Sequence, residues 1–167
     1  MQYKTIVELL NSDPTHHEVM VRGWVRSFRS NRFITLNDGS TIKTLQCVVD
    51  FENFDEELLK KVTVGAAIEV KGMLVESQGQ GQTVEIQVSK LTVLGEANPE
   101  DVKLTIISPK RHSLETLREQ AHLRIRTNTF GAVMRMRSKL AFAVHEYFQK
   151  NGFYYMHSPV ITGSDAE

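Results

Sequence analysis

The chain has 167 residues, of which 41% are hydrophobic and 24% are charged. This length suits one ordinary domain, or one small domain with part of another. The formal net charge is zero, so overall charge indicates no partner and only its local distribution is informative. No stretch approaches the roughly 20 apolar residues of a membrane span, and the first residues lack the apolar segment of a signal peptide. We therefore expect a cytoplasmic protein without a membrane partner.

The first half of the chain is predicted to form strands, because short apolar runs alternate with polar residues and turn signals. A short amphipathic helix is expected first, over residues 5–11, and another over 51–61, closed by Gly65. A bulge is expected at Gly72, inside a strand. The first strand is expected to continue past residue 25. The predicted strands cover residues 19–25, 33–36, 45–49, 67–75 and 83–89.

Five strands with a helix after the third follow the order of an OB-fold, a small Greek-key barrel that binds oligonucleotides on one face. Another small barrel is the competing interpretation of this pattern. The single cysteine, Cys47, lies among apolar neighbours in the third strand and is expected to be a small buried hydrophobe. The predicted fold class is β-rich with α: a five-stranded barrel followed by a connector and a helical segment.

The second half of the chain is predicted to be mostly helical. Residues 95–109 contain two prolines and a polar run, which indicates a connector. A short helix is expected over 114–123, and a longer amphipathic helix over 128–151 is expected to end at Gly152. Residues 153–156 are then expected to form a strand.

Arginines and aromatic residues are interleaved in the first predicted strand and the turn after it, with no acidic residue between 19 and 33. Arginines bind phosphates and aromatic rings stack on unpaired bases, so the cluster predicts a nucleic-acid-binding face. In the alternative interpretation, Trp24 and Phe28 belong to the barrel core and the arginines form a solvated face. The cluster consists of Arg22, Trp24, Arg26, Phe28, Arg29, Arg32 and Phe33.

Two polar residues within apolar strands are further candidates for base contacts. The amide of Gln46 offers both donors and acceptors to a base edge. The carboxylate of Glu85 accepts from exocyclic amines, although its charge repels phosphates. Taken singly, both are also explained as ordinary surface residues of half-buried strands.

No complete catalytic or metal-binding arrangement is recognisable in the sequence. It contains no glycine-rich phosphate loop with Lys and Ser or Thr, no nucleophile elbow and no metal-ligand spacing. His145 is expected to be structural. A second basic region, residues 110–139, either meets an RNA backbone or pairs with acidic groups elsewhere, and the spacing leaves both interpretations open.

Several segments together resemble a known family. Residues 21–26, 33–39 and 45–48 resemble the anticodon-binding OB-fold of the aspartyl-, asparaginyl- and lysyl-tRNA synthetases. Residues 150–161 resemble motif 1 of class II synthetases, the helix and strand ending in a proline that build the dimer interface. Residues 122–130 are similar to the asparaginyl branch, whereas the aspartyl and lysyl enzymes usually carry a Tyr-Leu-Asp-Leu type of sequence there.

The resemblance implies roles for residues of the barrel. Phe33 matches the aromatic residue that stacks on an anticodon base, and Gln46 matches a glutamine that reads the anticodon. Arg29 and Glu85 fall at other positions that contact the anticodon. The implied partner is an asparagine-accepting tRNA, and no DNA partner is expected.

The resemblance also implies roles near the end of the chain. Gly152, Phe153 and Pro159 match motif 1 at the interface of a homodimer, and Glu167 matches a glutamate near the ammonium group of the amino acid. In this family ATP and Mg²⁺ convert the amino acid, here asparagine, to an adenylate that is passed to the tRNA. Motifs 2 and 3, which hold ATP, are absent from the sequence. We therefore expect no catalytic residue, no bound metal and no adenylate formation by this chain alone.

The implied organisation is an OB-fold domain over residues 1–100, a connector over 101–121 and the start of a class II catalytic domain over 122–167. The chain is accordingly interpreted as the N-terminal third of a longer enzyme. An aspartate-specific relative is one alternative, against which residues 122–130 argue. A free-standing OB-fold RNA-binding protein is the other, against which motif 1 argues.

Overall fold

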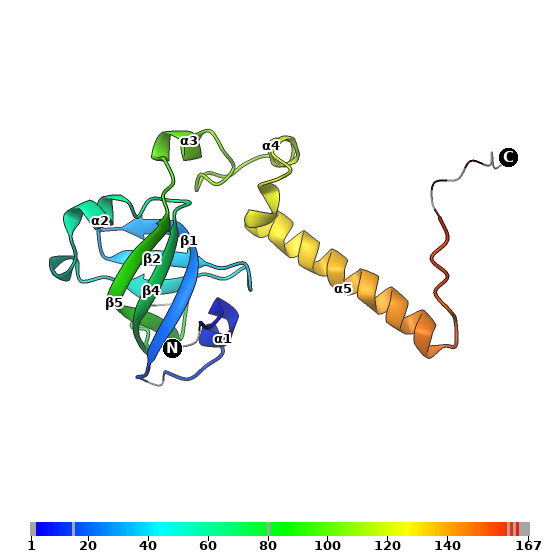
Figure 1. Cartoon of the computed structure of the whole chain (residues 1–167), viewed down its shortest axis with the longest axis horizontal. Coiled ribbons are helices and arrows are strands. Elements are labelled where there is room, and N and C mark those ends of the chain that lie inside the picture. The colour runs from blue at the N-terminus through cyan, green and yellow to red at the C-terminus, as the bar shows by residue number, and fades with distance from the viewer. Residues whose placement is uncertain (1–2, 15, 80, 160, 162, 164–167) are drawn as a thin grey trace. The chain divides into compact units, whose positions relative to one another are not determined.

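The structure is a computed structural model that describes residues 3–14, 16–79, 81–159, 161 and 163. The chain divides into two compact units, residues 1–131 and 132–167. The first unit contains all five strands, and the second contains most of one long helix and the segment after it (Figure 1).

The first unit is built around a closed barrel with the strand order β1-β2-β3-β5-β4. All neighbouring strands are antiparallel except β3 and β5, which pair in parallel. This closure, with a helix between β3 and β4, confirms the predicted OB-fold. The strands are β1 (Glu18–Arg29), β2 (Phe33–Asn37), β3 (Leu45–Val48), β4 (Ala67–Glu76) and β5 (Val84–Gly95).

Strand β5 is longer than predicted, because it reaches Gly95 instead of ending at residue 89. It pairs with β3 near its beginning and with β4 along its whole length. Strand β1 likewise pairs with both β2 and β4. Both long strands therefore serve two neighbours, which is how five strands close into a barrel.

The predicted bulge at Gly72 is confirmed. The register between β4 and β5 shifts between Lys71 and Gly72. A Cβ atom added at Gly72 would collide with the backbone carbonyl oxygen of Gln87. Only glycine permits this close approach of two backbones.

Inward-facing side chains fill the barrel. Burial alternates along β2 and β3, so that Ile34, Leu36, Leu45 and Cys47 are fully buried while their neighbours in sequence are partly exposed. Cys47 is thus the buried hydrophobe that was predicted. The alternation assigns every second residue of these two strands to the outer face.

The predicted N-terminal helix is present as α1 (Ile6–Leu10). Thr5 and Glu8 form a capping box at its beginning, and Ile6 and Leu9 belong to the core. The backbone N–H of Ile6 also donates to the carboxylate of Asp38 at 2.8 Å, which attaches α1 to the turn after β2.

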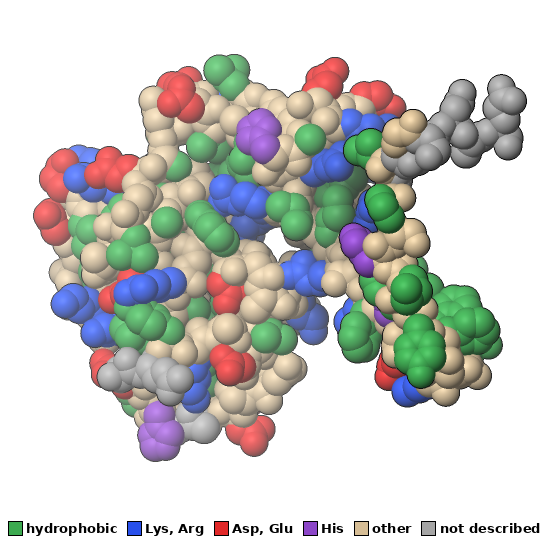
Figure 2. Space-filling view, turned by 45° about the vertical axis from the view of Figure 1, so that its right-hand side comes forward, with side chains coloured by type: hydrophobic (Ala, Val, Ile, Leu, Met, Phe, Trp, Pro, Cys, Tyr) green, Lys and Arg blue, Asp and Glu red, His purple; other side chains and the backbone are tan. Residues whose placement is uncertain are grey.

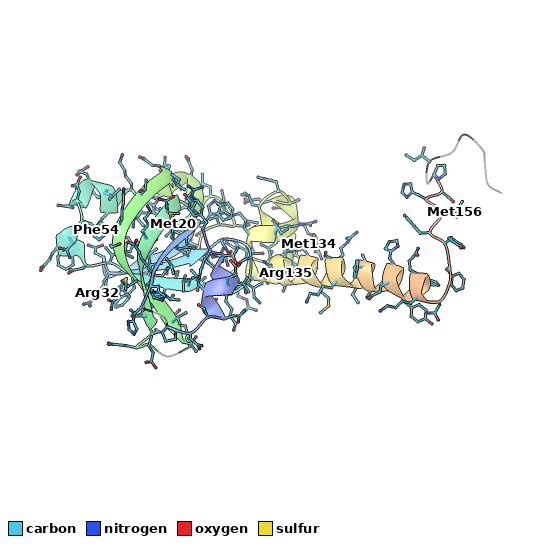
Figure 3. The ribbon with its side chains drawn as sticks, turned by 60° about the horizontal axis from the view of Figure 1, so that its bottom comes forward. Met20, Arg32, Phe54, Met134, Arg135 and Met156 are labelled. Carbon is cyan, nitrogen blue, oxygen red and sulfur yellow. The ribbon has the colours of Figure 1, made fainter. Side chains whose placement is uncertain are left out.

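The prediction of one helix over residues 51–61 was wrong. The segment forms a 3-10 turn, η1 (Phe51–Asn53), and a separate helix, α2 (Glu56–Lys60). Phe54, labelled in Figure 3, is extended between them, and the side chain of Asp55 caps α2. Gly65 does not close this helix, since it lies in the turn before β4 with φ +91°.

The connector after β5 contains regular structure that was not predicted. Asn98 caps a helix at α3 (Pro99–Lys103), which begins with a proline. The next helix, α4 (Leu114–Glu119), ends earlier than predicted. The side chain of Gln120 binds the backbone of Leu104 and Ile106 at this point. A second 3-10 turn, η2 (Arg124–Arg126), precedes the long helix.

The long helix, α5 (Asn128–Lys150), ends as predicted at Gly152, which has φ +82°. The N–H of Gly152 donates to the carbonyl of Gln149, and the N–H of Phe153 donates to that of Phe148, both at 3.1 Å. These two bonds make a Schellman motif. Within the described part of the chain, no helix is long and apolar enough to cross a membrane.

The predicted strand over residues 153–156 does not form, since no regular element follows α5 among the described residues. A strand requires a neighbour for its backbone groups, and the described residues supply none here. The surface of α5 carries many apolar side chains (Figure 2). Val133, Met136, Leu140, Phe142 and Val144 are each between 50% and 69% exposed.

Candidate nucleic-acid interface

The outer face of β1, β2, β3 and β5 brings together the barrel residues singled out in the sequence. Strand pairing places Arg29 opposite Phe33 and Thr35 opposite Gln46. Because the alternate residues of β2 and β3 point into the core, Phe33 and Gln46 both point outward. Glu85 on β5 is next to Gln46. The four residues Arg29, Phe33, Gln46 and Glu85 therefore share one face.

The β1–β2 turn places two cations beside the outward-facing aromatic ring. The guanidinium of Arg32 lies 5.8 Å from the ring centroid of Phe33. Arg29 and Arg32 are both exposed, and Figure 3 shows Arg32 on the barrel. Ser30 and Asn31 between them adopt positive φ values of 55° and 49°, which tighten the turn. Exposed cations next to an aromatic ring are suited to phosphate contact and base stacking.

Gln46 and Glu85 form a hydrogen-bonded pair on this face. Nε2 of Gln46 donates to Oε2 of Glu85 at 3.0 Å, and the hydroxyl of Ser77 donates to the same oxygen at 2.9 Å. Glu85 is only 7% exposed, so the alternative interpretation of Glu85 as an ordinary surface residue is wrong. A carboxylate with two donors on one oxygen is a fixed acceptor.

Ser77 was missed by the sequence analysis. It lies in a polar loop after β4 and carries no pattern that distinguishes it from a solvated serine. Its proximity to Glu85 follows from the β4–β5 register, which places Val75 opposite Glu85. The sequence indicated the bulge at Gly72, but not which residues of β4 and β5 pair on either side of it.

Two of the four clustered arginines have partners within the protein. Arg22 forms an ion pair with Glu69 at 3.0 Å and lies 3.7 Å from the ring centroid of Tyr3. Arg26 donates a hydrogen bond to the backbone carbonyl of Arg126 at 2.8 Å. Burial lowers the pKa of Arg26. Both make contacts within the protein, and their part in the predicted nucleic-acid-binding face stays a prediction.

The aromatic residues of the cluster also separate. Phe28 packs against the core, as its alternative interpretation held. Trp24 is not a core residue, since it is 40% exposed and stacks with the guanidinium of Arg126 at 4.8 Å from the ring centroid. Trp24 points outward opposite Asn37 at one end of the β1–β2 pair, and Phe33 lies opposite Arg29 at the other end.

The C-terminal candidates lie in the second unit or outside the described residues. Gly152 ends α5, and the ring of Phe153 packs edge-on against Phe148, with centroids 5.3 Å apart. Pro159 is exposed. Glu167 lies outside the described residues.

Metal-binding side chains are scattered over the described part of the chain. Among the described residues, no three His, Cys, Asp or Glu side chains lie together as ligands for a metal ion. The described residues therefore offer no metal site built from three such protein ligands.

The barrel is similar to a known family of domains. The tRNA anticodon family, described as an OB-fold nucleic acid binding domain, matches residues 19–94. These residues run from the start of β1 to the end of β5 and include the whole outer face. The barrel fold and this family match together define an OB-fold domain of the tRNA anticodon class.

The similarity extends beyond the barrel. An asparagine–tRNA ligase of Cytophaga hutchinsonii is 52% identical over 97% of this chain and 35% of the relative. One of Parabacteroides distasonis is 50% identical over the same shares. The structure of Entamoeba histolytica asparaginyl-tRNA synthetase in complex with asparaginyl-adenylate is 26% identical, with a TM-score of 0.74 over 89% of this chain and 36% of that chain. The chain is a homologue of the asparagine–tRNA ligases, and it spans about a third of the length of these relatives.

Proposed function

We propose that this chain carries the anticodon-recognition part of an asparagine–tRNA ligase. The observation that carries the proposal is the outer face of the OB-fold, where Phe33 and the Gln46–Glu85 pair lie on adjacent strands. The similarity to asparagine–tRNA ligases supports the choice of tRNA as the ligand and of asparagine as the amino acid.

Each group on the face has a separate task in this proposal. The ring of Phe33 supplies a platform for one unpaired base, which is worth about 1–3 kcal/mol per stacked base. Gln46 and Glu85 supply hydrogen-bonding groups to base edges. Arg29 and Arg32 neutralise phosphates beside the stacked base, which adds affinity without selecting a sequence.

The ligase reaction as a whole belongs to the longer enzyme. In it, ATP and Mg²⁺ would supply the activation of asparagine before its transfer to tRNA. On the basis of the family resemblance, we assign this activation to other parts of the longer enzyme. We place Glu167 beside the ammonium group of the amino acid on the basis of the family resemblance alone. We also assign the enzyme to the cytoplasm, where tRNA is charged.

The second unit is assigned to dimer formation. Contiguous exposed apolar surface of the kind found on α5 is typical of protein–protein interfaces. We propose that α5, with Gly152, Phe153 and Pro159 after it, packs against a second copy in the whole enzyme. Sedimentation equilibrium of the whole enzyme tests this, with Leu140→Glu expected to shift dimer to monomer.

The test of the main proposal is a titration of the full chain with asparagine tRNA at one fixed salt concentration. A copy of the tRNA changed only at the middle base of the anticodon is titrated beside it. Salt is fixed because phosphate contacts give affinity that depends on salt and ignores sequence. The proposal expects clearly weaker binding of the altered tRNA.

Phe33→Ala is the variant that connects this result to the face, and it is expected to remove most of the difference between the two tRNAs. Phe142→Ala removes an equally apolar ring, 69% exposed, from α5 and serves as the matched control. Equal binding of both tRNAs by the unaltered chain would reduce the face to a general phosphate-binding surface and contradict the proposal.

A further inference from the structure

The hydroxyl of Ser77 connects the β4–β5 loop to the Gln46–Glu85 pair. Its Oγ lies 2.9 Å from Oε2 of Glu85, 3.2 Å from the backbone nitrogen of Gly79 and 3.4 Å from Nε2 of Gln82. The backbone N–H of Ser77 also donates to the carbonyl of Thr83 at 3.0 Å, which closes the loop. Ser77 is therefore held in place by the loop on one side and by Glu85 on the other.

The direction of the hydrogen bonds follows from the groups involved. The backbone N–H of Gly79 and the amide nitrogen of Gln82 are donors, so Oγ of Ser77 accepts from both. A hydroxyl has one proton, and the remaining neighbour is Oε2 of Glu85. The proton of Ser77 therefore points at the carboxylate, and Glu85 is fixed as an acceptor.

The same reasoning fixes the amide of Gln46. Its contact with the Glu85 carboxylate at 3.0 Å requires a donor, which only the nitrogen end of an amide provides. Nε2 is therefore turned toward Glu85, and Oε1 is the end that faces away from it. Without this pairing, the two ends of a glutamine amide exchange by rotation about its last bond.

We propose that Ser77 is a positioning residue for base selection on this face. By holding the carboxylate of Glu85, it keeps Oε1 of Gln46 available to accept from an N–H group on the edge of an unpaired base. The inference rests on the proposed function, because it concerns how the same face chooses between bases. Ser77 itself need not touch the RNA.

The variants Ser77→Ala and Ser77→Thr test this role. Ser77→Ala removes the proton that holds Glu85, whereas Ser77→Thr retains a hydroxyl at this half-buried position. Ser89→Ala is the matched control, because the hydroxyl of Ser89 binds the carbonyl of Lys71 on the same strand pair, away from Glu85. Thermal unfolding of each variant establishes that it is folded.

The measured quantity is the ratio of the dissociation constants for the altered and native asparagine tRNA at fixed salt. Ser77→Ala is expected to reduce this ratio by about three- to tenfold, the effect of one typical intramolecular hydrogen bond. Ser77→Thr and Ser89→Ala are expected to keep it within about twofold. The inference would be overturned if Ser77→Ala kept the ratio of the unaltered chain, including the case in which Ser77→Ala weakened the binding of both tRNAs equally.

A double-mutant cycle with Gln46→Ala separates positioning from a purely structural role. If Ser77 acts through Gln46, Ser77→Ala has no further effect on the ratio once Gln46 is removed. An equal effect in both backgrounds would overturn the inference even if discrimination falls. The unaltered chain separates a failure of the proposed function from a failure of this inference. If the unaltered chain binds both tRNAs equally, the proposed function and this inference are both contradicted. If the unaltered chain discriminates and Ser77→Ala retains that discrimination, this inference alone is contradicted.

Discussion

The guanidinium of Arg126 stacks over the ring of Trp24, 4.8 Å from its centroid. The backbone carbonyl of Arg126 accepts a hydrogen bond from Arg26 at 2.8 Å, so two contacts attach η2 to β1. Burial lowers the pKa of Arg126, and repulsion from Arg26 lowers it further. The aromatic face and the carbonyl oxygen replace part of the water that these cations lose.

Arg126→Ala should expose Trp24 to water without unfolding the barrel. Trp24 is the single tryptophan of the chain, so its fluorescence reports this site alone. We expect emission at longer wavelength and a change in unfolding free energy of about 1 kcal/mol or less, the usual size of a cation–π contact. Arg118→Ala, an exposed arginine of α4, is the control. Unchanged emission for Arg126→Ala would show that the stack is not populated in solution.

Arg29→Ala should weaken tRNA binding through the loss of one phosphate contact. The slope of the logarithm of the binding constant against the logarithm of salt concentration is expected to fall by about 0.7, the value for one charge on single-stranded nucleic acid. The discrimination between native and altered anticodons should stay the same. Titrations at several salt concentrations measure both quantities.

The control for Arg29 is Lys90→Ala, which removes an exposed cation from β5. It is expected to leave the salt slope unchanged. If Arg29→Ala instead lowers discrimination at constant slope, Arg29 contacts a base and its assignment to a phosphate is wrong.

Gly72→Ala should destabilise the barrel by more than about 2 kcal/mol, because its Cβ has no space against the backbone of Gln87. Gly95→Ala is the matched control, because a Cβ atom at Gly95 would lie 3.8 Å from the Cβ atom of Ala67, an ordinary contact distance. Thermal or denaturant unfolding compares the two variants. Equal stability would mean that β4 and β5 shift register to admit the methyl group.

Stability should depend on the ionisation of Cys47 in alkaline solution. Burial raises the pKa of this thiol, and the nearby Glu85 carboxylate raises it further. The folded protein therefore holds the proton more tightly than the unfolded chain, whose thiol titrates near pH 8.5. The protonated thiol makes its full contribution to the free energy of unfolding below that pH. As the pH rises further, this contribution is lost, and the loss amounts to about 2 kcal/mol at pH 10.

Denaturant unfolding at pH 7.5 and pH 10 measures this effect as a difference between two proteins. Cys47→Ala lacks the thiol and should lose less stability between the two pH values than the unaltered chain. An identical loss in both would assign the alkaline destabilisation to other groups.

Much of the barrel and part of its face were predictable from local patterns. Cys47 was expected inside because its neighbours are apolar, and Gln46 was expected outside because polar residues of a half-buried strand alternate outward. Phe33 was singled out by the cluster of arginines and aromatic residues and by the family resemblance. The turn residues and the glycine at the bulge indicated where strands end or bend. These signals require only a few neighbouring residues, which is why the sequence carries them.

The failed predictions concern residues whose local signals conflict. Residues 51–61 show helical spacing, but Asp55 caps a new helix and leaves Phe54 extended. Residues 153–156 are rich in strand-forming aromatic residues, yet a strand depends on a partner that the described residues do not contain.

By itself the sequence determined the order of the strands, the inward and outward faces and the family resemblance, because these depend on local periodicity and local motifs. Only the tertiary structure decided which polar groups meet. It turned Arg22 and Arg26 to partners inside the protein and joined Ser77 to Glu85 and Gln46. Gln46 and Glu85 are 39 residues apart, and their contact depends on the register with which the barrel closes. Register is set jointly by all five strands and the bulge between β4 and β5, so no single segment of the sequence specifies it.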